Sequence, residues 1–296
     1  MSRSASLAGD TAWTRPGARR RGRLYRLLGG SMSLALGGVL VGLFVLMALL
    51  GPYLAPHDPL AMDLSARFQK PSAQHWAGTD QFGRDVFSRI LHGAGTSLLA
   101  AVTAEAIALA AGTLIGLLSG YVRGRFDLVV QRILEILMAV PGLLLAVVIV
   151  AVLGPGLQNV MIAVGLAGIP TYARLVRGQV LAAAEQEYVE AARAMGAGSR
   201  RIMLRHIMPN IVAPVLVVGT MGLAGAIQAT AALSYLGMGA QPPDPVWGTM
   251  VAEAQVFIYN AWWLAAAPGA AIALAVLGFN LLGDGLRDVL DPRTRR

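Results

Sequence analysis

Acidic side chains inside apolar stretches are the first candidates for chemistry in this sequence. Glu105 interrupts an otherwise apolar run, and Glu135 follows Arg132 by three residues at the start of another. If these runs cross a membrane, an ionised Glu105 costs about 2.5–3.5 kcal/mol or more, so it must be protonated, paired or facing water. Glu105 therefore either lines a pathway and meets a cationic amine, or makes a structural hydrogen bond to a neighbouring helix. A spacing of three lets Arg132 and Glu135 pair on one helix face, either for gating or for structure alone.

The other reactive side chains form no recognised catalytic or metal-binding motif. Cysteine is absent, and the sequence has neither an H-E-x-x-H nor a G-x-S-x-G motif. The four histidines lie in separate loops without metal-ligand spacing: His57, His75, His92 and His206. The single lysine, Lys70, precedes Pro71 instead of the Ser or Thr of a P-loop, so the chain does not bind ATP in a Walker fold of its own. We expect no catalytic residue, metal or cofactor in this chain.

The composition indicates the kind of element that must position these groups. Hydrophobic residues make up 56% of the 296 residues and charged residues only 14%, against about 25% in soluble domains. A helix needs about 20 apolar residues to cross the hydrocarbon core, and charge-free runs of that length recur along the chain. We predict an all-α polytopic membrane protein with six transmembrane helices. Their approximate ranges are 32–50, 96–119, two helices within 136–173 separated by Gly154-Pro155-Gly156, 211–229 and 261–282.

Small and polar residues predict how these helices meet. In the second span, small residues recur every four positions beside Glu105 and predict a close helix–helix seam. These residues are Ala104, Ala108, Gly112, Gly116 and Gly120. Pro141 is expected to kink the third span. Asn280 and Asp284 share a face near the inner end of the last span, where they serve either helix-end hydrogen bonding or gating.

The distribution of arginine predicts the orientation in the membrane. Most of the 24 basic residues lie in the N-terminal arm, in two loops and in the tail, and cytoplasmic loops are the ones that retain positive charge. We therefore expect both termini in the cytoplasm, and we interpret the net charge of +8 as a sign of topology, with no nucleic-acid partner. The predicted divisions are a basic cytoplasmic arm (1–31), a first transmembrane helix (32–50), an extracytoplasmic loop (51–95), a five-helix core (96–286) and a cytoplasmic tail (287–296).

The cytoplasmic loop 179–210 is long and has helical character. Its alanine-rich and glutamate-rich sequence predicts a helix over Leu181–Met195, which Gly196 ends. Ser199 is expected to cap a second helix, Arg200–Met208, before Pro209. The loop is either a solvated connector or a docking element, in which small alanines permit close approach while Tyr188 and Met195 supply apolar anchors.

The same loop resembles the EAA loop of ABC importer permeases. Glu190-Ala191-Ala192 is followed by Gly196 four residues after Ala192 and by Pro209 thirteen residues after Gly196. His206 and Met208 depart from the common pattern, which has aliphatic residues there. In that family the loop sits in a groove of a cytoplasmic ATPase and transmits its closure. The resemblance implies a coupling role for Tyr188, Glu190, Ala191, Ala192, Met195, Gly196, Arg200, Arg205 and Pro209.

Three further stretches resemble the dipeptide/oligopeptide/nickel class of these permeases. They are the GTDQFGRDVFSR segment at 78–89, the LGMGAQPPDPVWG segment at 236–248 and the FNLLGDGLRDVLDP segment at 279–292. The resemblance covers about residues 30–293 and is to the second of the two permease subunits, with the C subunit of dipeptide importers as the nearest likeness. Related chains often have an acid around positions 229–230, where this chain has Ala229 and Thr230.

The resemblance implies a fold, a set of partners and a mechanism. The fold would be that of a type I ABC importer permease in the bacterial inner membrane. The partners would be a second homologous permease, two ATPases that bind ATP and Mg²⁺, and an extracytoplasmic solute-binding protein. The cargo would be a peptide, most simply a dipeptide, moved by alternating access, with nickel chelates or other small solutes as the alternative.

Two other kinds of protein remain as alternatives. A stand-alone secondary transporter would show inverted repeats, and the sequence has no internal repeat. An intramembrane enzyme would have to use Glu105 and Glu135, two carboxylates on different spans without a flanking motif.

Overall fold

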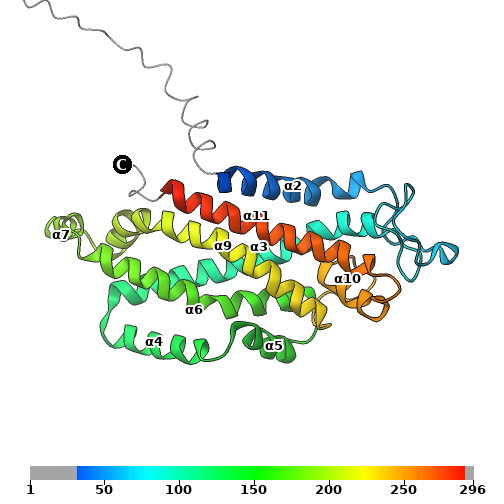
Figure 1. The fold of residues 1–296 in the computed structure, drawn as a ribbon. Coiled ribbons are helices and arrows are strands. Elements are labelled where there is room, and N and C mark those ends of the chain that lie inside the picture. The colour runs from blue at the N-terminus through cyan, green and yellow to red at the C-terminus, as the bar shows by residue number, and fades with distance from the viewer. Residues whose placement is uncertain (1–31, 291–296) are drawn as a thin grey trace, which may run out of the picture.

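The computed structural model describes residues 32–290, which form an elongated bundle of helices lying roughly side by side (Figure 1). The predicted basic arm, residues 1–31, lies outside the described residues, as do residues 291–296 of the predicted tail.

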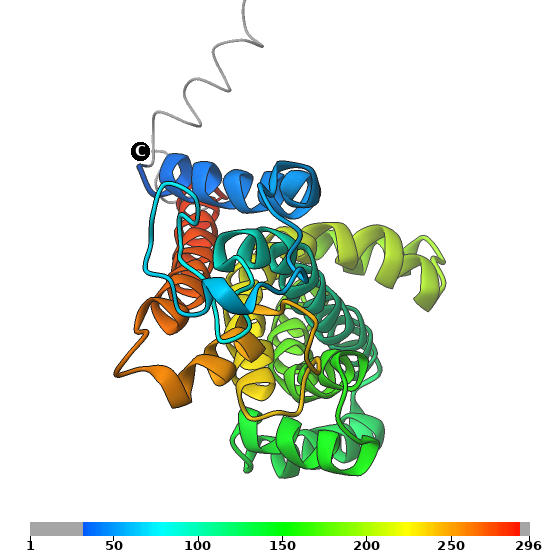
Figure 2. The same ribbon diagram turned by 90° about the vertical axis from the view of Figure 1, so that its right-hand side faces the viewer.

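Five of the described helices are long and apolar enough to cross a membrane. They are α2 (Met32–Leu54), α3 (Val86–Val122), α6 (Leu157–Ala184), α9 (Met208–Tyr235) and α11 (Trp263–Leu290). A sixth crossing results if α4 (Gly124–Met138) and α5 (Gly142–Leu153) count as one broken span. The predicted all-α fold is confirmed for the described residues, with six spans if this broken pair counts as one and five otherwise. Viewed end-on, α2 and the α4–α5 pair lie on opposite sides of the bundle (Figure 2).

The third predicted span is broken at Pro141. The axes of α4 and α5 differ by 91°, and Pro141 is the residue directly before α5. Proline has no N–H to donate and clashes with the preceding helical turn, so a break is expected here. Helix α4 also begins at Gly124, well before the predicted start at 136, because its charged residues hid it from a search for charge-free runs.

Helix α3 is much longer than the predicted span of 96–119. Its 37 residues extend about 55 Å at 1.5 Å per residue, well beyond a hydrocarbon core of about 30 Å. The helix begins at Val86 because Asp85 caps it, accepting a hydrogen bond of 2.8 Å from the Ser88 N–H. Residues 86–95, predicted to lie in an extracytoplasmic loop, therefore form the first turns of α3.

Glycines bring α3 and α6 into close contact, as the spacing of small residues predicts. Gly112 lies against Tyr172, and Gly116 lies against the backbone of Ala173. Gly120 makes the same kind of approach to Val180. A side chain at any of these positions would separate the two helices, so the seam depends on glycine for its packing.

Small residues also hold α11 beside α2 and α9. Gly37 of α2 lies against the backbone of Leu282, and Gly285 of α11 lies against Leu34. Gly283 faces Met221 of α9. These contacts place α11 between α2 and α9, an order that Figure 1 also shows.

The predicted helix Leu181–Met195 is wrong, because the structure divides this stretch at Glu185 and Gln186. Residues 181–184 are the last turn of α6, and α7 (Glu187–Ala194) is a separate helix. Helix α7 changes direction so that Val189 and Ala192 are buried against the neighbouring helices, a tertiary contact that helix propensity does not register. Gly196 does end α7, with a φ of +79° that favours glycine.

The second predicted helix of this loop, Arg200–Met208, does not end at Pro209. A short helix α8 (Ser199–Arg201) passes through a π-helical segment η2 (Ile202–Ile207) directly into α9. Pro209 stands in the first turn of α9, directly after the π-helical segment η2. Gly198, not Ser199, is the residue at the cap of α8, and no side-chain capping bond is present there.

Short helices complete the end of the bundle opposite α7. They are η1 (Leu64–Ala66), α10 (Trp247–Ala254) and η3 (Gln255–Phe257). Helix α10 lies between α9 and α11 in the chain and was not predicted. Trp247 is almost fully buried there, and its indole N–H donates to the Ile90 carbonyl of α3 over 3.1 Å.

Candidate functional site

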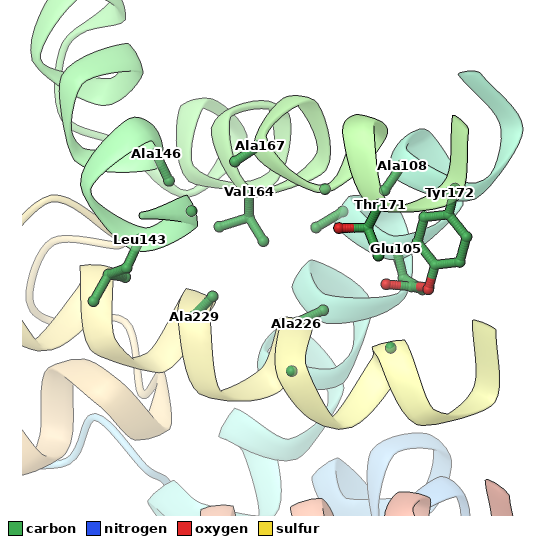
Figure 3. Close-up of a pocket in the computed structure, with 15 residues that line it drawn as sticks. Glu105, Ala108, Leu143, Ala146, Val164, Ala167, Thr171, Tyr172, Ala226 and Ala229 are labelled. Carbon is green, nitrogen blue, oxygen red and sulfur yellow. The ribbon is translucent and has the colours of Figure 1, made fainter. Parts of the chain in front are cut away.

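Four helices enclose a cavity of about 280 Å³ beside the middle of α3, α6 and α9 (Figure 3). Alanine and glycine make up most of its wall, so backbone rather than side chains defines much of the space. Among the lining residues, only Glu105, Thr171 and Tyr172 have polar side-chain atoms. A mostly apolar cavity with a few convergent polar groups is a typical small-molecule site.

Glu105 and Tyr172 form a hydrogen-bonded pair at one end of this cavity. The Tyr172 hydroxyl donates to Glu105 Oε1, and the two side chains come from α3 and α6 respectively. Gly222 of α9 lies directly against both groups, which leaves no room for a side chain at that position. Figure 3 shows the two oxygens next to each other and Leu143 towards the other end. Glu105 is therefore partnered inside the bundle and reaches the cavity.

The break at Pro141 contributes to the cavity wall. Because α5 turns away from α4 there, its first residues Gly142, Leu143 and Ala146 face the same space as Glu105. Ala229, at the position where related chains often have an acid, lines the cavity as a small apolar group. Thr230 is buried and donates to the Ala226 carbonyl of its own helix over 2.8 Å.

The segment from α7 to η2 projects at one end of the bundle, away from the other helices (Figures 1 and 2). Most of the residues predicted to dock an ATPase are exposed on it: Tyr188, Glu190, Ala191, Met195, Gly196, Arg200, Arg205 and Pro209. Met195 is 81% exposed, an unusual position for a large apolar side chain. Ala192, in contrast, is only 1% exposed.

Helix α7 is joined firmly to α6 and α9. Val189 and Ala192 belong to one buried cluster with Val180, Ile202 and Ile207. In addition, Asn210 Nδ2 of α9 donates to the Tyr188 hydroxyl over 3.1 Å. A displacement of α7 would therefore move the start of α9 with it.

Comparison with known proteins decides the family. Residues 112–296 match the family of binding-protein-dependent transport system inner membrane components. Residues 34–71 match the N-terminal transmembrane domain of oligopeptide transport permease C. The chain belongs to this family of transport permeases. It is a multi-pass inner-membrane permease subunit of an ABC importer.

Curated relatives of the permease match almost its full length. The probable D,D-dipeptide transport system permease protein DdpC of Escherichia coli K12 is 43% identical, over 97% of each chain. The dipeptide transport system permease protein DppC of Alkalihalophilus pseudofirmus is 45% identical, over 88% of this chain and 85% of its own. The glutathione transport system permease protein GsiD of Escherichia coli O6:K15:H31 is 47% identical, over 86% and 84% of the respective chains.

A solved structure supports the fold of the permease independently. A chain from the inward-facing MetNI methionine ABC transporter superposes with a TM-score of 0.56 at 20% identity. The match covers 69% of the permease and 97% of that chain. At this level of identity the likeness concerns the fold alone.

A buried charge network explains the GTDQFGRD segment of the permease. Arg84 Nε donates to Asp80 Oδ2 over 2.6 Å, and Arg89 Nη1 contacts the same oxygen at 3.2 Å. Both guanidinium groups also reach Glu253 Oε2 of α10, at 3.4 and 3.2 Å. Arg84 and Arg89 are each 1% exposed, so the network ties the loop between α2 and α3 to α3 and α10.

A second ion pair was missed from the sequence. Arg177 of α6 donates twice to Asp127 of α4, with both distances 2.6 Å, and Ser119 of α3 donates to the same carboxylate. The three helices are thereby joined at the end nearer α7. The sequence alone indicated only a positive charge at Arg177, because nothing in a single chain links it to an acid 50 residues away.

The remaining predicted pathway residues lie away from the cavity. Arg132 Nη1 and Glu135 Oε2 form the ion pair that their spacing allows, at 2.8 Å, but both side chains are exposed on α4. Asn280 and Asp284 are exposed on α11 and do not line the cavity. Of the five predicted pathway residues, the structure brings only Glu105 to this space.

Proposed function

We propose that this permease forms half of the translocation pathway for short peptides, most simply dipeptides, in an ATP-driven importer. The names of the relatives point to peptides: a D,D-dipeptide, a dipeptide and the tripeptide derivative glutathione. The observation that carries the proposal is a cavity of small residues with one carboxylic acid, Glu105, at membrane depth.

The chemistry of that cavity suits a peptide amine. A short peptide at neutral pH has an α-ammonium group, and a carboxylate oxygen accepts its hydrogen bonds. Tyr172 fixes the orientation of the Glu105 carboxyl by donating to one of its oxygens. Alanine and glycine around the acid leave side-chain space for different residues of the cargo. A nickel chelate with anionic ligands would be repelled by an ionised Glu105, so the same acid favours peptides over that alternative.

Coupling to ATP hydrolysis would run through α7 and α9. An ATPase that holds Tyr188, Glu190 and Met195 moves α7, and the buried cluster with Ile207 transfers that motion to α9. The middle of α9 supplies Gly222 and Ala226 to the cavity wall. Movement at the cytoplasmic end would thus change the wall that the cargo contacts, which is the physical requirement of alternating access.

The proposal includes partners and an orientation. A second, homologous permease would supply the other half of the pathway, two ATPases would bind ATP and Mg²⁺, and an extracytoplasmic protein would deliver the peptide. This chain itself would bind no nucleotide and catalyse no reaction. The start of α2 and the end of α11 lie at the same end of the bundle as α7 (Figure 1), which supports cytoplasmic placement of both termini.

Uptake by the reconstituted importer tests the proposal. ATP-dependent uptake of a labelled dipeptide is measured with wild-type permease and with Glu105→Gln. The substitution removes the charge but keeps the size, so KM for the dipeptide should rise about tenfold or more, the value of one hydrogen bond to a charged group. Wild-type importer should discriminate against the N-acetylated dipeptide, and the variant should not.

Two results would contradict the proposal. One is a wild-type importer that does not move dipeptides but moves nickel chelates. The other is a Glu105→Gln variant that discriminates against the acetylated dipeptide as strongly as wild type does. Glu135→Gln is the matched control, because it removes an exposed acid outside the cavity and should leave KM unchanged.

A further inference from the structure

The loop between α2 and α3 brings together three residues that the sequence had scattered. His57 lies just after the end of α2, His75 lies in the loop, and Asp85 caps α3. His75 Nδ1 is 2.8 Å from Asp85 Oδ1, and His57 Nδ1 is 3.8 Å from Asp85 Oδ2. The histidines have no metal-ligand spacing in the sequence, and it is the fold of the loop that brings His57 and His75 to Asp85.

We propose that His57, His75 and Asp85 form a zinc site at the extracytoplasmic end of the permease. One ligand atom from each residue lies within 4.8 Å of the other two. Bond lengths of about 2.0–2.2 Å at tetrahedral zinc place ligand atoms roughly 3.3–3.6 Å apart. The His75–Asp85 contact is shorter than this and the His57–Asp85 contact is slightly longer, and the two involve different oxygens of the carboxylate. Binding one ion would therefore require His75 to move away from Asp85 and His57 to move towards it.

The donor set selects a transition metal over Mg²⁺ or Ca²⁺. Imidazole nitrogen suits zinc and its neighbours, whereas the hard cations prefer oxygen ligands alone. The chain has no cysteine, so no thiolate competes for the ion. Two imidazoles and one carboxylate leave one position of a tetrahedral zinc for water. Without metal, the His75 Nδ1–H donates to Asp85; with zinc at Nδ1, the ring proton resides on Nε2.

The backbone holds each ligand in place. The Ser88 hydroxyl accepts from the His57 N–H over 3.1 Å, and the Ser88 N–H donates to Asp85 over 2.8 Å. The Ser72 hydroxyl accepts from the His75 N–H over 3.1 Å. The Asp85 side chain is 1% exposed and the His75 side chain 16%, while His57 is 41% exposed and opens the site to solvent. An ion bound here would join the end of α2 to the start of α3.

Metal analysis of the intact importer tests the proposal. The complex, purified through a tag without histidine, is stripped with chelator, dialysed against Zn²⁺ and measured by mass spectrometry for metal content. Wild type should retain one more zinc per permease than His57→Asn or His75→Asn. The variants should bind that zinc more than about 100-fold more weakly, since even changes outside the ligand set cost about 10- to 100-fold. Mg²⁺ in excess should not displace it.

Controls separate this site from background binding. His92→Asn and His206→Asn should retain the zinc, because His92 Nδ1 bonds to the Ser88 carbonyl of its own helix and His206 lies in η2.

Zn²⁺ should also slow hydrogen exchange over residues 55–60 and 72–85 in wild type and not in His57→Asn. Equal zinc content in wild type and His57→Asn would overturn the proposal. His57 is exposed, so its variant is expected to fold, and the result does not depend on peptide transport.

Discussion

Glu105 and the buried arginines at the end of the bundle opposite α7 show how single residues are used in this permease. Glu105 accepts a hydrogen bond from Tyr172 and also lines the cavity, so it combines a structural partner with access to that space. Arg84 and Arg89 are fully enclosed and share the two acids Asp80 and Glu253. The first arrangement fits a binding role, and the second fits a structural one.

The charge network yields a stability prediction. Asp80→Asn leaves two buried arginines with one acid between them, and breaking a buried pair costs about 3–5 kcal/mol. The free energy of unfolding of the permease in detergent should fall by about 3 kcal/mol or more. Asp244→Asn, at an exposed loop position, is the matched control and should change it by less than about 0.5 kcal/mol. Equal stability of the two variants would mean that the network contributes nothing.

The residue scale is also where prediction from sequence was weakest. Glu105 stands out because it is an acid in an apolar run. Asp127, Arg177 and the His57–His75–Asp85 group do not stand out, because the members of each group are 50, 28, 18 or 10 positions apart and only tertiary structure joins them. Asn280 and Asp284 were singled out by spacing alone, and the structure places both on an exposed face.

Helices meet in this molecule mainly through glycine. The four-residue repeat in α3 is readable from the sequence, and the structure shows its partner to be α6. The sequence did not indicate which helix would pack against this repeat, because a stripe of small residues has no chemistry specific to one partner. The division of residues 181–195 into the end of α6 and α7 escaped prediction for a similar reason, because burial of Val189 and Ala192 decides it.

The seam yields a prediction about two glycines of the same helix pair. Gly116→Ala would place a methyl group against the Ala173 backbone, so the free energy of unfolding should fall by about 1–3 kcal/mol. Gly178→Ala on α6 meets open space, and it should be neutral or stabilise the helix by about 0.5–1 kcal/mol. Unfolding of both variants in mixed micelles measures the difference. Equal effects would contradict the packing described for α3 and α6.

At the scale of the whole molecule, the two ends of the bundle differ in structure. One end presents α7 and its exposed Met195, and the other holds the loop between α2 and α3, helix α10 and the charge network that joins them. The cavity lies between them, beside the middle of α3, α6 and α9. Hydropathy was sufficient to locate the spans approximately, and Pro141 correctly indicated a kink in the third, whereas the 91° size of that break and the cavity it helps to form required the structure.

We propose that α7 couples this permease to partner ATPases. Purification of the tagged permease from its native membrane in mild detergent is the most direct test of this coupling. Mass spectrometry should identify a second permease and P-loop ATPases with the wild-type chain. Gly196→Pro should lose the ATPases while still inserting in the membrane, because proline fixes φ near −65° and Gly196 needs +79°.

Gly198→Pro is the matched control, since Gly198 already has a φ of −69° and its variant should retain the ATPases. Recovery of the wild-type chain without ATPases, still able to move solute after reconstitution, would contradict the coupling role of α7. Such a result would point instead to a transporter that works without partners.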